Sequence, residues 1–223
     1  GVGIADEIAR LYLPIKIEQG EEESTEVHYL TEKQLRQFSQ LYNTVKYPRT
    51  KDYIDMFLFS FYACGLRISD IITLEWKSVN FEKREIRKIL YKGDKLHTLP
   101  LNDGAIAILR KWQGRHDRFV FGLLHDTFDL TDKEELKRMR LNKNRAIKTS
   151  LKTLGDKIGL PFNLGMHIAR HTFAVMALNK GIDVHKISRL MGHSSIMVTE
   201  KVYAQFLPST LEDEVMNKLN FSL

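Results

Sequence analysis

Residues 54–74 read IDMFLFSFYACGLRISDIITL, and this stretch sets the expectation for the fold of the whole chain. Its first part, Ile54 to Leu66, is the longest apolar run of the sequence, although polar residues and a glycine interrupt it. The run is too short and too interrupted to span a bilayer, so we interpret it as a buried helix. Gly65 suits the left-handed residue that ends a helix, and a short helix over residues 69–74 is expected after Arg67.

The pattern on either side of this stretch predicts further helices and one hairpin. Thr31 can cap a helix that begins an apolar stripe, and the buried helix itself is expected over residues 51–64. Strand-like periodicity follows in residues 85–92 and 95–101, on either side of Gly93-Asp94, a pair that suits a type II′ turn. Glycines and prolines divide the rest into expected helices at residues 103–113, 132–155, 165–180, 183–191, 195–206 and 209–219. The prediction is a mainly α fold with one small antiparallel β-sheet, an α+β domain.

The composition is that of an ordinary globular protein with a surplus of positive charge. Hydrophobic residues make up 43% and charged residues 28%, and 34 Lys and Arg against 28 Asp and Glu give a formal net charge of +6. A basic protein suits a polyanion such as nucleic acid, although charge alone fits a merely basic protein equally well. The cations are densest between Lys133 and Lys157, where a DNA-facing helix and a solvated face are both possible.

Targeting signals and cysteines give the expected compartment. The sequence shows no secretory signal pattern and no apolar stretch long enough to cross a membrane. Cys64 is the single cysteine, so no disulfide can form within the chain. We therefore expect a cytoplasmic protein.

Arg67 and Lys92 are the first residues that could carry chemistry. An arginine between an apolar helix and an apolar turn needs an anionic partner. Asp70, one helical turn on, could form a structural ion pair with Arg67 or could orient it towards a phosphate. Lys92 in the expected hairpin turn could serve solubility alone or could carry a mobile ammonium group to a phosphate.

A second group of polar residues lies near the end of the chain. His167 and Arg170 are three residues apart, so a helix places them on one face, where they could clamp a phosphate or be ordinary satisfied helical residues. His171, one residue further, is expected to point elsewhere, into packing or a backbone contact. His193 follows Gly192 on the corner between two helices, a suitable place to face a ligand. Tyr203 lies on an amphipathic helix, where a tyrosine usually belongs to the core or an interface.

Taken in order, these motifs resemble the tyrosine recombinase (phage integrase) family. They are Gly-Leu-Arg-Ile-Ser-Asp, a hairpin lysine, His-x-x-Arg, Leu-Met-Gly-His-Ser and a tyrosine, and the resemblance covers roughly Val27 to Leu219. It implies a fold like the catalytic domain of tyrosine recombinases and type IB topoisomerases, with catalytic residues Arg67, Lys92, His167, Arg170, His193 and Tyr203. The interval from His193 to Tyr203 is one residue longer than the commonest form of the family, but no other tyrosine follows His193.

The resemblance implies a site-specific recombinase, or integrase, that cleaves and rejoins DNA through a covalent 3′-phosphotyrosine. Arg67, Arg170 and His193 would hold the phosphate, and Tyr203 would attack it. His167 would orient the phosphate or accept the tyrosine proton, and Lys92 would protonate the leaving 5′-oxygen. Because the intermediate keeps the bond energy, neither a metal nor another cofactor is expected.

The expected partners and domains follow from the same resemblance. The partner would be double-stranded DNA, bound by a homo-tetramer on two duplexes that is monomeric when free in solution, without contact to a membrane. Bound to DNA, the protein would be associated with the nucleoid. Residues 1–27 would be a linker or the remnant of a missing N-terminal DNA-binding domain, residues 28–207 the catalytic domain, and residues 208–223 a C-terminal helix or tail for contact between protomers.

Three other interpretations remain to be separated from this one. His167 and His171 have the spacing of a two-histidine metal site, but the glutamate of a zinc protease is missing and Arg170 would repel the ion. The region from Asp183 to Phe206 could imitate a helix-turn-helix regulator, which would leave Arg67 unexplained. A type IB topoisomerase shares the chemistry, and strand exchange between two DNA sites would tell it apart.

Overall fold

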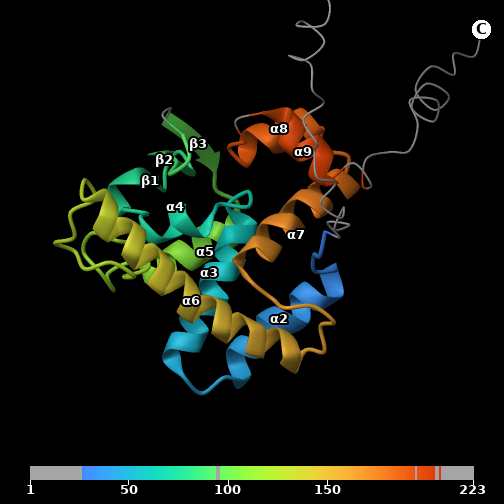
Figure 1. The fold of residues 1–223 in the computed structure, drawn as a ribbon, viewed down its shortest axis with the longest axis horizontal. Helices are drawn as coiled ribbons and strands as arrows, with labels where there is room; N and C mark the ends of the chain where they lie inside the picture. The colour runs from blue at the N-terminus through green and yellow to red at the C-terminus, as the bar shows by residue number, and fades with distance from the viewer. Residues whose placement is uncertain (1–26, 94–95, 194, 204–205, 207–223) are drawn as a thin grey trace, which may run out of the picture.

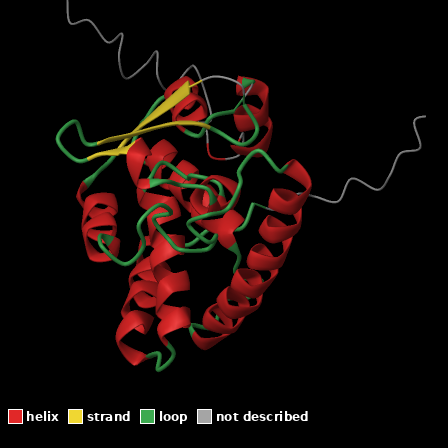
Figure 2. Ribbon diagram, turned by 90° about the vertical axis from the view of Figure 1, so that its left-hand side faces the viewer, coloured by secondary structure: helices red, strands yellow, loops and turns green. Residues whose placement is uncertain are grey.

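The computed structural model describes residues 27–93, 96–193, 195–203 and 206 (Figure 1). The expected tail up to residue 26, the expected helix at residues 209–219 and the turn residue Asp94 lie outside these ranges. The secondary structure of the described residues is mainly helical, with one small antiparallel sheet at one end of the helical body (Figure 2). The predicted α+β class is therefore confirmed.

Helix α3 (Pro48–Tyr62) is the centre of the fold, as its sequence predicts (Figure 1). It packs against the following helices: α2 (Glu32–Thr44), α4 (Ile68–Ile72), α5 (Asp103–Trp112), α6 (Lys133–Lys157) and α7 (Met166–Asn179). The chain continues into α8 (Val184–Leu190) and α9 (Ile196–Tyr203), which pack against each other. Thr31 caps α2 through a hydrogen bond from the Gln34 amide, which confirms the predicted helix start.

The polar interruptions of the apolar run tie α3 to α5. The carboxylate of Asp55 is buried and accepts hydrogen bonds from the Lys111 ammonium at 2.8 Å and the Trp112 indole at 2.9 Å. Asp52, just before this run, pairs at 3.0 Å with Arg115, which follows the end of α5. A buried carboxylate without partners is costly, so these two carboxylates tolerate burial because α5 and the residues after it supply their donors.

The sheet has three strands in the order β1 (Val79–Asn80), β2 (Glu85–Ile89) and β3 (Leu96–Pro100), with the 3₁₀ turn η1 (Trp76–Ser78) before β1. Its buried pair, Ile86 opposite Leu99, faces the core.

The expected two-residue type II′ turn between β2 and β3 is wrong. The register of the strands shows this, because a loop made of Gly93 and Asp94 would place Tyr91 opposite Leu96, whereas Leu96 pairs with Ile89. Leu90 is buried, and the Tyr91 amide donates to the Asp70 carboxylate at 2.7 Å. These contacts tie this part of the hairpin to α4.

The turn after α3 brings the chain close to α7. Cys64 and Gly65 both have positive φ, 55° and 71°, which confirms the predicted left-handed helix end at Gly65. A Cβ atom on Gly65 would lie 3.1 Å from Cγ of Arg170 and 3.3 Å from the Phe173 ring. The missing side chain of Gly65 is therefore what allows α7 to approach this turn.

Gly65→Ala should lower the free energy of unfolding by more than Gly114→Ala, measured by urea denaturation. Both glycines have positive φ, so both substitutions incur a backbone cost of about 1–2 kcal/mol. Gly114 has open space around it, whereas the new methyl group at Gly65 meets Arg170 and Phe173. We expect an extra loss of about 1 kcal/mol or more at Gly65. Equal losses would show that α7 yields freely at this point.

Candidate active site

Two arginines from different elements converge on one backbone carbonyl. Arg67 stands just before α4, and Arg170 lies on α7. Arg170 donates from Nη1 to the Gly65 carbonyl at 2.6 Å and from Nη2 to the Met191 carbonyl at 2.8 Å. Arg67 donates from Nη1 to the same Met191 carbonyl at 3.4 Å and to the Gly192 carbonyl at 3.3 Å. The turn after α8 thus holds both guanidinium groups side by side.

This pair of cations is short of negative charge. Burial and, to a smaller extent, the charge of the nearby Arg67 together lower the pKa of Arg170 to about 9. Burial also lowers the pKa of Arg67, against the opposing effect of Asp70. Among the ion pairs of the described residues, none joins a carboxylate to Arg67 or Arg170. Such a site favours an incoming anion, because each cation is desolvated without compensation.

Asp70 has a different role from the structural ion pair with Arg67 that the sequence left open. Its carboxylate is fully buried, lies 3.6 Å from the Lys88 ammonium and accepts the Tyr91 amide. Lys88 also donates to the Asp70 carbonyl at 3.0 Å and to the Thr73 hydroxyl at 2.9 Å. Asp70 therefore joins α4 to the hairpin and leaves the guanidinium of Arg67 available.

The hairpin docks on the same turn that holds the arginines. His97 of β3 donates from Nε2 to the Leu190 carbonyl at 3.1 Å. The Leu90 side chain lies against Gly192, whose φ is 64° and whose missing Cβ makes room for it. In Figure 1 the sheet and the α8–α9 pair accordingly lie at the same end of the molecule. Lys92, two residues beyond Leu90, is exposed at the tip of this docked hairpin.

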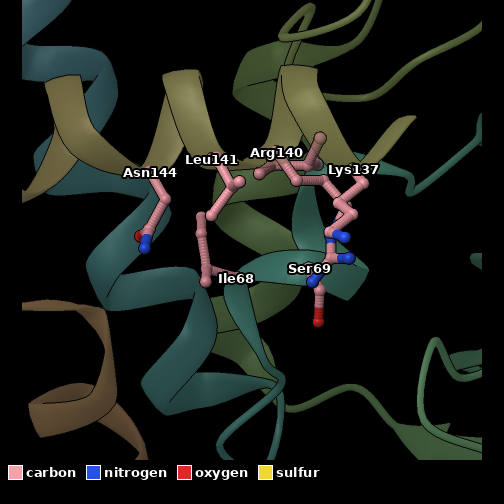
Figure 3. Close-up of a pocket in the computed structure, with 7 residues that line it drawn as sticks. Ile68, Ser69, Lys137, Arg140, Leu141 and Asn144 are labelled. Atoms are coloured by element: carbon pink, nitrogen blue, oxygen red, sulfur yellow. The ribbon is translucent and has the colours of Figure 1, made fainter. Parts of the chain in front are cut away.

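Helix α6 approaches the site from the side of α4. The guanidinium of Arg140 lies 3.4 Å from the centroid of the Tyr91 ring, a cation–π contact between α6 and the hairpin. Figure 3 shows Lys137, Arg140 and Leu141 of α6 opposite Ile68 and Ser69 of α4, around a hollow of about 120 Å³. The first half of the basic helix therefore adjoins the segment that follows Arg67.

His193 occupies the corner that its place after Gly192 predicts. Its Nδ1 is hydrogen-bonded to the Thr199 hydroxyl of α9 at 2.6 Å. Burial lowers the pKa of His193 to about 4, and the charges of Arg170 and Arg67 contribute. The ring is therefore neutral at pH 7 in the free protein, which leaves Nε2 as its remaining hydrogen-bonding atom. Ser195 caps α9 by accepting the Met197 amide at 3.3 Å, as predicted for one of two serines, and Ser194 lies outside the described residues.

Tyr203 ends α9 with its side chain 1% exposed and its hydroxyl 2.7 Å from Nδ1 of His171. Burial raises the pKa of Tyr203 to about 12, although the charge of Arg170 works in the opposite direction. His171 packs edge to face on the Tyr203 ring, as the expected packing role implies, but its hydrogen bond to the Tyr203 hydroxyl was not predicted. The available signal was its spacing of four residues from His167, which places both rings on one face of α7, 5.9 Å apart.

The structure thus gathers most of the predicted residues and adds one. Arg67, Arg170 and His193 meet around the turn after α8, and Tyr203 is joined to α7 through His171. His167 keeps part of its surface exposed, but its ring is partly desolvated by its neighbours, and this desolvation, followed by the charges of Lys148 and His28, lowers its pKa. The chemical roles of all six predicted residues stay predictions.

Neither a cluster of metal ligands nor a membrane-spanning helix is found in the described part of the chain. Across the described ranges, no group of three or more His, Cys, Asp or Glu side chains is arranged to hold a metal ion. None of the helices in the described part of the chain is long and apolar enough to cross a membrane.

Comparison with known proteins supplies the family. Residues 28–209 match the phage integrase family. The chain is 32% identical over 139 residues to the tyrosine recombinase XerC of Mannheimia succiniciproducens. The matched region covers 62% of this chain and 44% of XerC. The chain spans less than half the length of the curated relatives it matches.

Two solved structures share the fold. The Tn1549 transposon integrase in complex with a circular intermediate DNA has a TM-score of 0.65 at 17% identity, over 89% of this chain and 67% of that one. The catalytic domain of bacteriophage HP1 integrase has a TM-score of 0.54 at 22% identity, over 87% and 96%. The fold and the paired arginines define a tyrosine recombinase catalytic domain. The chain belongs to the phage integrase family.

Sulfate should raise the melting temperature of the protein, because it binds the uncompensated cations of the folded state. Arg67→Met removes one of the two guanidinium groups, so we expect it to reduce this rise by about half or more. Arg36→Met is the matched control, since Arg36 is an exposed cation of α2 paired with Glu32. An equal rise in all three proteins, measured by thermal denaturation, would place the anion site elsewhere.

Proposed function

We propose that this chain is the catalytic part of a site-specific DNA recombinase that cleaves and rejoins DNA through a covalent 3′-phosphotyrosine. The observation that carries the proposal is the pair Arg67 and Arg170, which share the Met191 carbonyl and have no paired carboxylate among the described residues. A phosphodiester is an anion that gains charge when it is attacked, so fixed cations are the most effective help a protein can offer. Membership of the phage integrase family and the DNA complex of the Tn1549 integrase support the same assignment.

Each predicted residue has a place in this reaction. Arg67 and Arg170 hold the non-bridging oxygens, and His193 donates a further hydrogen bond from Nε2. The Tyr203 oxygen forms a bond to phosphorus, and the bond from phosphorus to the 5′-oxygen breaks. Lys92, exposed on the docked hairpin, supplies the proton to the leaving 5′-oxygen.

His167 and the cofactor question complete the mechanism. His167 is the exposed histidine of α7 and accepts the proton that Tyr203 loses or orients the incoming phosphate, in which case that proton passes to solvent. The phosphotyrosine keeps the energy of the broken bond, so rejoining by the free 5′-hydroxyl requires neither ATP nor a metal.

The partner we propose is double-stranded DNA, bound in part by the cations along α6. The exposed Lys137 and the half-buried Arg140 lie beside the segment after Arg67 (Figure 3) and would contact phosphates next to the cleavage point. We further propose that residues 28–207 act as the catalytic domain of a homo-tetramer on two duplexes. In that assembly residues 1–27 would connect to a DNA-binding domain and residues 208–223 would contact a neighbouring protomer.

Tyr203→Phe should abolish the covalent adduct with a nicked suicide DNA substrate while leaving DNA affinity within about twofold, because only one hydroxyl is lost. The assay is gel electrophoresis under denaturing conditions, run with excess EDTA and without ATP. An adduct that persists in the variant would move the nucleophile to another residue. A reaction that needs added metal would contradict the cofactor-free mechanism.

Strand exchange between two DNA sites separates a recombinase from a type IB topoisomerase, which relaxes supercoiled DNA. In a protein that joins residues 1–223 to an N-terminal DNA-binding domain, we expect strand exchange between two DNA sites. Relaxation of supercoils without exchange in that protein would favour the topoisomerase.

Arg67→Lys should lower the rate of adduct formation by about 100-fold with little change in melting temperature. Lysine keeps the charge but loses the planar fork of donors that reaches two oxygens at once. Arg36→Lys serves as the control for a conservative change at an exposed position. A large fall in melting temperature with a proportionate loss of DNA binding would instead make Arg67 a structural residue.

A further inference from the structure

The hydroxyl of Tyr203 has a partner that the proposed mechanism does not use. Nδ1 of His171 lies 2.7 Å from this hydroxyl, and the two rings meet edge to face with centroids 5.6 Å apart. The Tyr203 ring is buried in a small apolar cluster that includes Ala174, Ile187 and Met191. The ring is therefore confined by packing, and the direction of its hydroxyl is set by His171.

We propose that His171 is a positioning residue for the nucleophile, holding the Tyr203 hydroxyl beside Arg170 with its proton turned away from the incoming phosphate. This inference rests on the proposed function, since it takes Tyr203 as the nucleophile. It adds a residue of α7 that acts on the reaction through Tyr203.

The protonation state of His171 suits an acceptor. Burial, followed by the charges of His167, Arg170 and His28, lowers the pKa of His171 to about 4. His171 has titratable and charged neighbours on each element that packs around it. They are His167 and Arg170 on α7, His28 in the segment before α2, Tyr203 on α9 and His193 in the turn after α8. The ring is neutral at pH 7, and in the tautomer that carries its hydrogen on Nε2 the Nδ1 atom accepts a hydrogen bond from the Tyr203 hydroxyl.

The same contact keeps the phenolic oxygen close to the phosphate site. Arg170 precedes His171 on α7, and the charges of Arg170 and Tyr203 each alter the pKa of the other. A hydroxyl that donates its proton to His171 keeps its lone pairs free for attack on phosphorus. His171 thus orients the oxygen at the point where the phosphate would bind.

His171 acts by orientation and does not take the proton to completion. The pKa of the phenol is raised to about 12, whereas that of the imidazole is lowered to about 4. Values so far apart make full transfer to His171 strongly unfavourable, and an effective general base has a pKa near the working pH. Hydrogen-bond acceptance has no such requirement.

Helix α7 is a rigid base for this contact. Its Thr172 accepts the Leu30 amide at 2.9 Å and donates to the Ile168 carbonyl at 2.7 Å, both inside the core. The neighbouring residues Ala169 and Ala174 are fully buried. The position of His171 is therefore fixed by the core and not by the mobile side chains of the surface.

The first test compares His171→Phe with His171→Asn in single-turnover cleavage of the nicked suicide substrate. Phenylalanine keeps the ring volume but removes the acceptor, so the cleavage rate should fall about tenfold, the value of one hydrogen bond. The asparagine carbonyl oxygen can occupy the place of Nδ1 and should restore most of the rate, although it cannot act as a base. His185→Asn, at an exposed histidine of α8, is the control and should cleave at the wild-type rate.

The outcomes of this test separate three roles. Faster cleavage by His171→Phe would overturn the proposal, because His171 would then restrain Tyr203 in an unreactive state. A loss that asparagine fails to restore would also overturn it and would make His171 a proton acceptor. Wild-type rates in both variants would show that the contact has no part in cleavage.

The second test is independent of cleavage. A double-mutant cycle of Tyr203→Phe and His171→Phe, measured by urea denaturation, should show clear non-additivity if the two groups are hydrogen-bonded. Additive effects would show that the contact is absent in solution and would overturn the proposal. A wild-type protein that forms no adduct would overturn the proposed function and this role together, whereas a wild-type adduct with additive effects would overturn only the role of His171.

Discussion

The carbonyl oxygen of Met191 is the point on which the site depends. It accepts hydrogen bonds from both Arg67 and Arg170 and so holds two cations together that would otherwise repel each other. A carboxylate in this place would cancel part of their positive charge, whereas a neutral carbonyl leaves it intact. The protein therefore tolerates two desolvated guanidinium groups in its folded state, a cost that an incoming anion would relieve.

The rest of the site is arranged around the turn that supplies this carbonyl. Gly192 leaves room for Leu90 of the hairpin, and His97 donates to the Leu190 carbonyl just before it. On the other side, Gly65 permits Arg170 to approach the end of α3. Each of these close approaches requires a residue without a side chain, and both glycines have positive φ. Packing at two glycines thus brings the hairpin, α7 and the turn after α8 to one place.

The buried carboxylates of Asp55 and Asp70 are each contacted by donors from an element that is distant in sequence. Asp55 has its donors on α5, and Asp70 has its donors on the hairpin. In each case a polar residue inside an apolar stretch marks a contact between elements that are distant in sequence. Among the ion pairs of the described residues, no carboxylate joins the buried guanidinium groups of Arg67 or Arg170, and this distinguishes a site for an anion from a structural ion pair.

The sequence by itself determined the helices, their order and the family. Periodicity, caps and glycines are local signals, so they placed the helix end at Gly65 and the corner at His193 correctly. Local signals failed where a distant contact competed with them. The hairpin register was predicted wrongly where the Asp70 carboxylate accepts the Tyr91 amide, and β1 was missed because so short a strand has no period of its own. Only the tertiary structure decided that Asp70 pairs with Lys88 and that His171 meets the Tyr203 hydroxyl. Residue spacing reports which side chains share one helix face, whereas contacts between helices depend on how the whole core packs.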